Sequence, residues 1–256
     1  MKTGFRTAGF SKWTLGAALY EINDCGYDSV ELCLEHPGCR PELMDDGRIQ
    51  HIKKLLDETG LELSSVSYHG DGTPIEQRQE NTFLALDVAR KLEANVLVIN
   101  TEAKEPGNDR QYAGILERLR HLCAMAEEYD IDLALEPEPG LVIESTKDLE
   151  RTINVINSPR LKINLDIGHA FLTDNDVIKT IRRNCTKIVH THIEDIAGGI
   201  HKHLLPGEGE MNLTEIIRTL DEIGYGGYLT IDLFDLGDQP GEIARDALAA
   251  LKTVMP

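Results

Sequence analysis

Short apolar stretches alternate with longer helical patterns along the whole chain. Each apolar stretch is of strand type and is followed by a polar turn. We expect eight strands, over residues 5–10, 29–35, 62–69, 95–100, 132–138, 161–169, 188–195 and 228–235. Between them, apolar residues recur at helical spacing, and several of these segments end in Gly or Asn. The expected helices cover residues 14–26, 49–60, 82–94, 115–129, 149–156, 177–184, 213–224 and 243–254.

Eight strands that alternate with eight helices predict parallel strands joined by right-handed crossovers. An open, doubly wound sheet would produce the same alternation. A closed (β/α)8 TIM barrel, of class α/β, is favoured because the count is eight and 256 residues match a barrel with few insertions. The first strand–helix turn also lacks the GxGxxG pattern of a dinucleotide-binding sheet. We therefore expect a single barrel domain over residues 1–256.

The composition disfavours several kinds of partner. A formal charge of −18 repels phosphate backbones and anionic lipid headgroups, so neither nucleic acid nor a membrane surface is expected. No apolar run approaches the roughly 18–20 residues that span a bilayer, and the first residues lack the apolar region of a signal peptide. The five cysteines form no CxxC pair, which indicates free thiols. These features predict a cytoplasmic protein.

Polar residues gather where most of the expected strands end. In a TIM barrel these ends meet at one mouth, where functional residues stand. Side chains two apart on a strand share a face, so His190 and His192 point the same way, as do Glu136 and Glu138. The residues at these ends are His69, Glu136, Glu138, Asp166, His169, His190, His192, Glu194, Asp195, Asp232 and Asp235.

Several carboxylates and imidazoles that are buried together need a compensating charge. A divalent cation would compensate several carboxylates at once. Glu136, Asp166, His192 and Asp232 would supply three carboxylates and one imidazole. That donor set suits Mn²⁺, Mg²⁺, Co²⁺ or Zn²⁺, and of these we favour Mn²⁺.

Five stretches together resemble the xylose isomerase-like barrel superfamily, in its sugar phosphate isomerase/epimerase branch, over nearly the whole chain. The stretches are LALEPEPG (133–140), NLDIGHAF (164–171), VHTHIED (189–195), HKHLLPGEGEMN (201–212) and GYLTIDL (227–233). The resemblance implies one divalent metal held by Glu136, Asp166, His192 and Asp232. The acid on strand eight is usually Glu in the epimerases, so Asp232 is a departure that could move the metal or remove this residue from proton transfer.

The resemblance implies a metal-dependent isomerase or epimerase that acts on a sugar, ketose or related polyol. The metal would stabilise an enediolate, with Glu136 as the base and Asp232 as the second acid/base. The main alternative is a lyase or dehydratase that eliminates a β-substituent from a keto-polyol or 3-keto glycoside through the same enediolate. A barrel that only binds carbohydrate is a further alternative. The acidic loops after strands seven and eight disfavour a phosphorylated substrate.

Other residues at the mouth are candidates for contact with the substrate or a second cation. Substrate contact is expected for His69, Glu138, His169 and His203. His190 lies deeper on its strand and is expected to contact either the substrate or the residues that support the metal ligands. Trp13 is expected either to stack on a sugar ring or to cover the barrel rim. The related apurinic endonucleases hold three zinc ions on this barrel, and the resemblance places His169, His201 and His203 at a candidate second metal. Their set also needs a His at the end of strand four, where this chain has Asn100 and Thr101, and the negative charge argues against DNA repair.

Two further expectations concern a loop and a buried acid. The glycines of PGEGE (206–210) should let the loop after strand seven turn back over the mouth. Glu31, inside expected strand two, should form a structural ion pair. Homo-oligomers are common in the family, so a homo-oligomer is a further candidate assembly, although the sequence carries no interface signal.

Overall fold

The strands close into a parallel barrel in a computed structural model of the chain, which describes residues 1–108, 110–234 and 236–255. The strands are β1 (Lys2–Arg6), β2 (Ser29–Cys33), β3 (Glu62–Tyr68), β4 (Val96–Ile99), β5 (Asp132–Leu135), β6 (Leu161–Asp166), β7 (Ile188–Ile193) and β8 (Tyr228–Ile231). Each strand pairs with the next along the chain, and β8 pairs with β1. The expected TIM barrel is confirmed.

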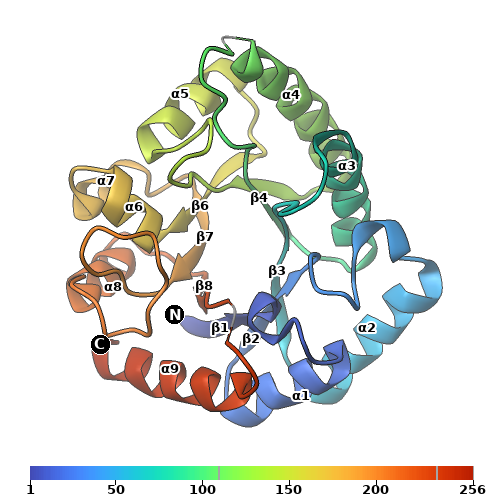
Figure 1. Ribbon diagram of the computed structural model, residues 1–256, viewed down its shortest axis with the longest axis vertical. Coiled ribbons are helices and arrows are strands. Elements are labelled where there is room, and N and C mark those ends of the chain that lie inside the picture. The colour runs from blue at the N-terminus through green and yellow to red at the C-terminus, as the bar shows by residue number, and fades with distance from the viewer. Residues whose placement is uncertain (109, 235, 256) are drawn as a thin grey trace.

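Helices form a ring around this barrel (Figure 1). They are α1 (Leu15–Cys25), α2 (Asp46–Thr59), α3 (Ile75–Lys91), α4 (Gln111–Tyr129), α5 (Thr146–Ile156), α6 (Ile167–Thr173), α7 (Val177–Arg183), α8 (Leu213–Glu222) and α9 (Pro240–Val254). Two short 3-10 helices, η1 (Thr7–Phe10) and η2 (Pro41–Leu43), follow β1 and β2. No helix in the described part of the chain is long and apolar enough to cross a membrane.

The structure corrects the bounds of several expected strands. The first strand was expected over residues 5–10, but β1 ends at Arg6. Phe5 and Phe10 are both fully buried and pack edge to face, so the apolar pattern came from a strand followed by a helical turn. The sixth strand ends at Asp166, because this carboxylate accepts the N–H of His169 at 2.7 Å and begins α6.

The main apolar core lies between the strands and the helices, whereas the barrel interior is largely polar. Side chains alternate between the two faces of a strand. On the inward face, Val96, Val98 and Ala134 form a small apolar cluster that is separate from the main core. Arg6 and Glu31 also lie inside the barrel and are buried. Buried charges need charged or hydrogen-bonding partners, so the interior is organised as a polar network.

Candidate metal centre

The four expected ligand residues converge on Nδ1 of His192. Oε2 of Glu136 lies 3.3 Å from this nitrogen, Oδ2 of Asp232 lies 3.7 Å away, and Oδ2 of Asp166 lies 3.8 Å away. Ligand atoms held about 2.0–2.2 Å from one cation are themselves roughly 3–4 Å apart. Asp166 Oδ2 is buried without a hydrogen-bond partner among the described residues, which is an acceptor that a cation would satisfy. One ligand atom from each of Glu136, Asp166 and His192 lies within 4.8 Å of the other two, and Asp232 forms a second such group with Asp166 and His203. Glu136, Asp166 and His192 are therefore a candidate set for one divalent ion, with Asp232 beside them.

A buried carboxylate on β2, Glu31, orients His192. Its Oε2 lies 3.0 Å from Nε2 of His192 and accepts a hydrogen bond from the Ser65 hydroxyl at 2.6 Å. When Nε2 of His192 carries the proton and donates to Glu31, the lone pair of Nδ1 faces the other carboxylates. Glu31 also forms the expected ion pair, with Nε of Arg6 at 3.0 Å. It therefore fixes the imidazole in the tautomer that a metal requires.

His190 lies below the candidate metal centre and contacts the residues that support His192, which is the second of its two expected roles. Its Nε2 is 2.9 Å from the same Glu31 oxygen and 3.2 Å from the Ser65 hydroxyl. The ring is 1% exposed and is not among the described residues that line the cavity at the barrel mouth. The alternation along β7 correctly placed His190 and His192 on one face, but the deeper imidazole contacts the supporting network.

Arg6, at the end of β1, is a functional residue that the sequence reasoning missed. Its Nη1 donates to both carboxylate oxygens of Asp232 at 3.1 Å, and its Nη2 lies 3.1 Å from Nδ1 of His69. Burial favours the neutral form of Asp232, but Arg6 and His192 hold the pKa of Asp232 below its ordinary value. The short side chain of Asp232 therefore stays ionised and is directed at the cluster.

The carboxylates around His192 favour a positive charge on or beside its imidazole ring. Burial disfavours an imidazolium, yet Glu31 and Glu136 raise the pKa of His192 well above its ordinary value. Burial likewise opposes ionisation of Glu136, but His192 and His69 lower the pKa of Glu136 well below its ordinary value. For Glu194, burial and the neighbouring Asp166 raise the pKa well above its ordinary value. The carboxylates outnumber the local cations, as expected of a cation site.

Glu136 and Asp232 of this cluster line a cavity of about 260 Å³ at the barrel mouth, whereas Asp166 and His192 are buried and are not among its described lining residues. The expected residues that line it are His69, Glu136, Glu138, His169, His201, His203 and Asp232. Sequence reasoning did not single out the other lining residues, Arg6, Ala8, Cys33, Glu35, Asp71 and Phe234. Trp13 is not among the described lining residues and packs edge to face against Phe10, with 5.6 Å between ring centroids, which favours the rim position over contact with a sugar.

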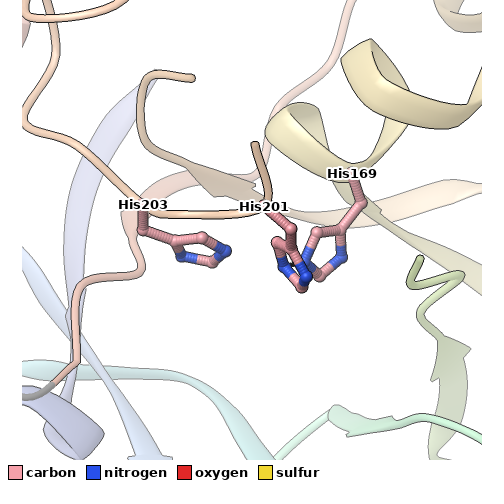
Figure 2. A group of neighbouring side chains, drawn as sticks. All are labelled: His169, His201 and His203. Carbon is pink, nitrogen blue, oxygen red and sulfur yellow. Dashed lines mark hydrogen bonds between the residues drawn. The ribbon is translucent and has the colours of Figure 1, made fainter. Parts of the chain in front are cut away.

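Three of the lining residues, His169, His201 and His203, form a cluster of neighbouring imidazoles (Figure 2). Nδ1 of His169 donates to the Pro137 carbonyl at 3.1 Å, and Nδ1 of His203 donates to the Asp232 carbonyl at 2.7 Å. The Nε2 atoms of His169 and His203 are then acceptors. Nε2 of His201 lies 2.8 Å from that of His169. One nitrogen from each ring lies within 4.8 Å of the other two, so the structure brings the candidate second cation set together.

Asp195 folds the loop with these histidines back over the mouth. Its Oδ1 accepts the N–H groups of Ile196 and Met211 at 2.9 and 3.1 Å, and its Oδ2 accepts that of Gly207 at 2.9 Å. Gly207 has a φ of +90°, which favours glycine. A Cβ on Gly209 would lie only 2.2 Å from Asp195 Oδ1. The glycines of PGEGE thus act as expected.

Glu138 lies on the cavity wall and is oriented by β4. Its Oε2 accepts a hydrogen bond from Nδ2 of Asn100 at 2.8 Å. Burial and the neighbouring Glu136 raise the pKa of Glu138. Asn100 follows β4, at the position where an endonuclease-like site would need a His. In this chain the residue orients the Glu138 carboxylate instead. Asp235 lies outside the described residues.

Comparisons with known proteins identify the family of the chain. A family model described as xylose isomerase-like TIM barrel matches residues 19–254. Fructoselysine 3-epimerase of Escherichia coli O157:H7 is 28% identical over 273 residues, covering 100% of this chain and 99% of that protein. Inosose dehydratase of Clostridium perfringens is 21% identical over 237 residues, covering 80% and 78%. The crystal structure of the IOLI protein with a bound zinc atom has a TM-score of 0.78 at 18% identity, covering 99% and 96%. The chain belongs to the xylose isomerase-like TIM barrel family.

Proposed function

We propose that this chain is a divalent-metal-dependent epimerase or isomerase of a ketose or related polyol. One observation carries the proposal: the carboxylates of Glu136 and Asp232 reach the same imidazole nitrogen, at 3.3 and 3.7 Å, from β5 and β8. Because the two carboxylates approach from different strands, one can accept a proton on one side of a bound sugar carbon while the other donates a proton on the opposite side. The 28% identity to a fructoselysine 3-epimerase over the full chain supports this function.

Glu136, Asp166, His192 and Asp232 would hold the metal. Mn²⁺ is the favoured ion, since three carboxylates and one imidazole form a predominantly hard donor set. When bound, the cation polarises a substrate carbonyl and makes the neighbouring C–H more acidic. Metal binding by a relative of the same fold, which was crystallised with zinc, supports a resident ion here.

The residues of the chain would then move the proton and orient the sugar. Glu136 is the proposed base, and the charges of His192 and His69 keep it ionised. Asp232, held by Arg6, is the proposed second acid/base. Nε2 of His203 is a buried acceptor without a partner among the described residues, so it is suited to a substrate hydroxyl.

Glu138, His69 and His169 are the other proposed substrate ligands. We propose that the three-histidine cluster also contacts hydroxyl groups and that one metal is resident. Two ions per chain would instead assign His169, His201 and His203 to a second cation. The carboxylates at the mouth make an uncharged sugar the expected substrate, in preference to a sugar phosphate.

A dehydratase is the second candidate, because inosose dehydratase matches 80% of the chain. The same proton removal would then be followed by loss of a β-hydroxyl. The two reactions are distinguished by product mass, since elimination releases one water and epimerisation leaves the formula unchanged.

The test incubates the Mn²⁺-loaded protein with a panel of ketoses, ketose phosphates and inososes in D₂O. We expect an epimerised ketose with one deuterium at the inverted carbon, seen by NMR and mass spectrometry, and weaker turnover of the phosphates. Glu136→Gln should abolish exchange. Glu128→Gln, which changes an exposed acid on α4, should retain it. Absence of exchange with every substrate would overturn the proposal, and loss of water would select the dehydratase.

A further inference from the structure

A second hollow adjoins the cavity that holds the proposed metal centre. It has a volume of about 300 Å³ and lies between the segments that follow β2 and β3. Glu35 and Asp71 line both hollows, so the two spaces adjoin at these residues. The metal-centre cavity, at about 260 Å³, is below the ~300–1,000 Å³ common for small-molecule sites. A substrate larger than one sugar would therefore extend into the second hollow.

The second hollow carries an excess of negative charge. Among its described lining residues are three carboxylates, Glu35, Glu42 and Asp71, and one guanidinium, Arg40. Glu35 is already used, because its Oε1 accepts the N–H groups of His69 and Gly70, both at 2.6 Å. The carboxylates available to a ligand are therefore those of Glu42 and Asp71, and both residues are exposed to the hollow.

A buried polar atom in the wall of the hollow lacks a well-formed hydrogen bond. Oδ1 of Asn81 has no partner of good geometry among the described residues, although Asn81 is only 4% exposed, and the Tyr68 hydroxyl lies beside the Asn81 and Thr73 side chains. Nδ2 of Asn81 donates to Oε2 of Glu42 at 3.1 Å, which fixes the amide and leaves its oxygen as an acceptor. Buried polar atoms without partners are costly, so this wall is suited to a ligand that donates hydrogen bonds.

Resting on the proposed function, we propose that this hollow is a substrate subsite for an ammonium group carried by the ketose on a short arm. An ammonium offers three N–H donors and no acceptor, which matches the Asn81 oxygen and the carboxylates of Glu42 and Asp71. A carboxylate or phosphate arm would meet like charge, and an alkyl arm would leave the acceptors unpaired. The substrate class is thus an amine-bearing ketose.

The test compares ketohexoses that carry an n-pentyl, ω-aminopentyl or ω-carboxybutyl ether arm on the first or the last carbon. We expect kcat/KM for the aminopentyl compound to exceed that for the pentyl compound by about tenfold, from two partly exposed charge pairs. Added salt should reduce this ratio. Glu42→Gln and Asp71→Asn should each remove most of the gain, whereas Glu128→Gln should leave it unchanged.

The outcomes separate this inference from the proposed function. Equal kcat/KM values for the three arms at both positions, with clear turnover of the ketose, would overturn the subsite and leave the epimerase intact. A pentyl or carboxybutyl arm that outperforms the aminopentyl arm would do the same. Absence of turnover with every ketose, armed or not, would overturn both.

Discussion

Asp195 should hold the loop with His201 and His203 over the cavity, and Asp195→Ala should release it. The carboxylate accepts three backbone N–H groups at 2.9, 2.9 and 3.1 Å. A hydrogen bond to a charged group contributes about 1.5–3 kcal/mol, but the released amides regain water. We therefore expect the free energy of loop opening to fall by about 3–4 kcal/mol in total. Asp195→Asn keeps one acceptor oxygen and should lose about 1–2 kcal/mol.

Hydrogen exchange of the loop amides measures this effect directly. A loss of 3–4 kcal/mol corresponds to exchange that is about a hundred- to a thousandfold faster for the amides of Gly207 and Met211. The KM for the ketose should rise with it, because His203 leaves the cavity wall. Unchanged loop exchange in Asp195→Ala, with the rest of the barrel intact, would refute the role given to this carboxylate.

Three further changes test the packing and charges of the site. Gly168→Ala should destabilise the fold by about 1–3 kcal/mol in urea unfolding, since the new Cβ would lie 2.1 Å from Oε1 of Glu194; an unchanged midpoint would contradict this. Burial opposes ionisation of Glu35, but the charges of His69 and Arg6 lower its pKa. The ionised carboxylate therefore stabilises the fold above pH ~4.5, and this stabilisation is lost as the pH falls through the lower folded pKa. Glu35→Gln should flatten that part of the stability–pH curve, and a parallel curve would argue against these charge interactions. Asp232→Asn should lower kcat by at least about a hundredfold, from loss of an acid/base. Near-normal kcat would remove Asp232 from proton transfer.

The barrel and most of its mouth could be predicted from the sequence because both depend on local patterns. Strand and helix periodicity is visible residue by residue, and parallel pairing brings every strand end to one mouth. Glu136, Asp166, His192 and Asp232 each follow or end a recognisable strand. Their convergence therefore needed no knowledge of how the side chains pack.

The supporting network could not be predicted in the same way. Arg6 was hidden because the apolar run 5–10 mixes the end of β1 with η1, so the inward face of the strand was not apparent. The sequence did offer one clue, because Arg6 is two residues from Gly4 and therefore shares its face of β1. A Cβ on Gly4 would lie 2.7 Å from the Ser29 hydroxyl, which shows that this face is the crowded interior of the barrel. The role of His190 depends on its distance to Glu31 across the barrel, and that of Trp13 on its packing against Phe10. Neither contact leaves a trace in local spacing.

The central claim is a single metal bound by Glu136, Asp166, His192 and Asp232, and elemental analysis of the purified protein tests it most directly. The protein is compared with its Glu136→Gln and His192→Ala variants, with Glu128→Gln as the matched control. The account predicts about one divalent ion per chain in the protein and the control, with Mn²⁺ favoured, and its loss from both site variants. No bound metal after reconstitution with Mn²⁺, Mg²⁺, Co²⁺ or Zn²⁺, or full retention in both variants, would contradict it.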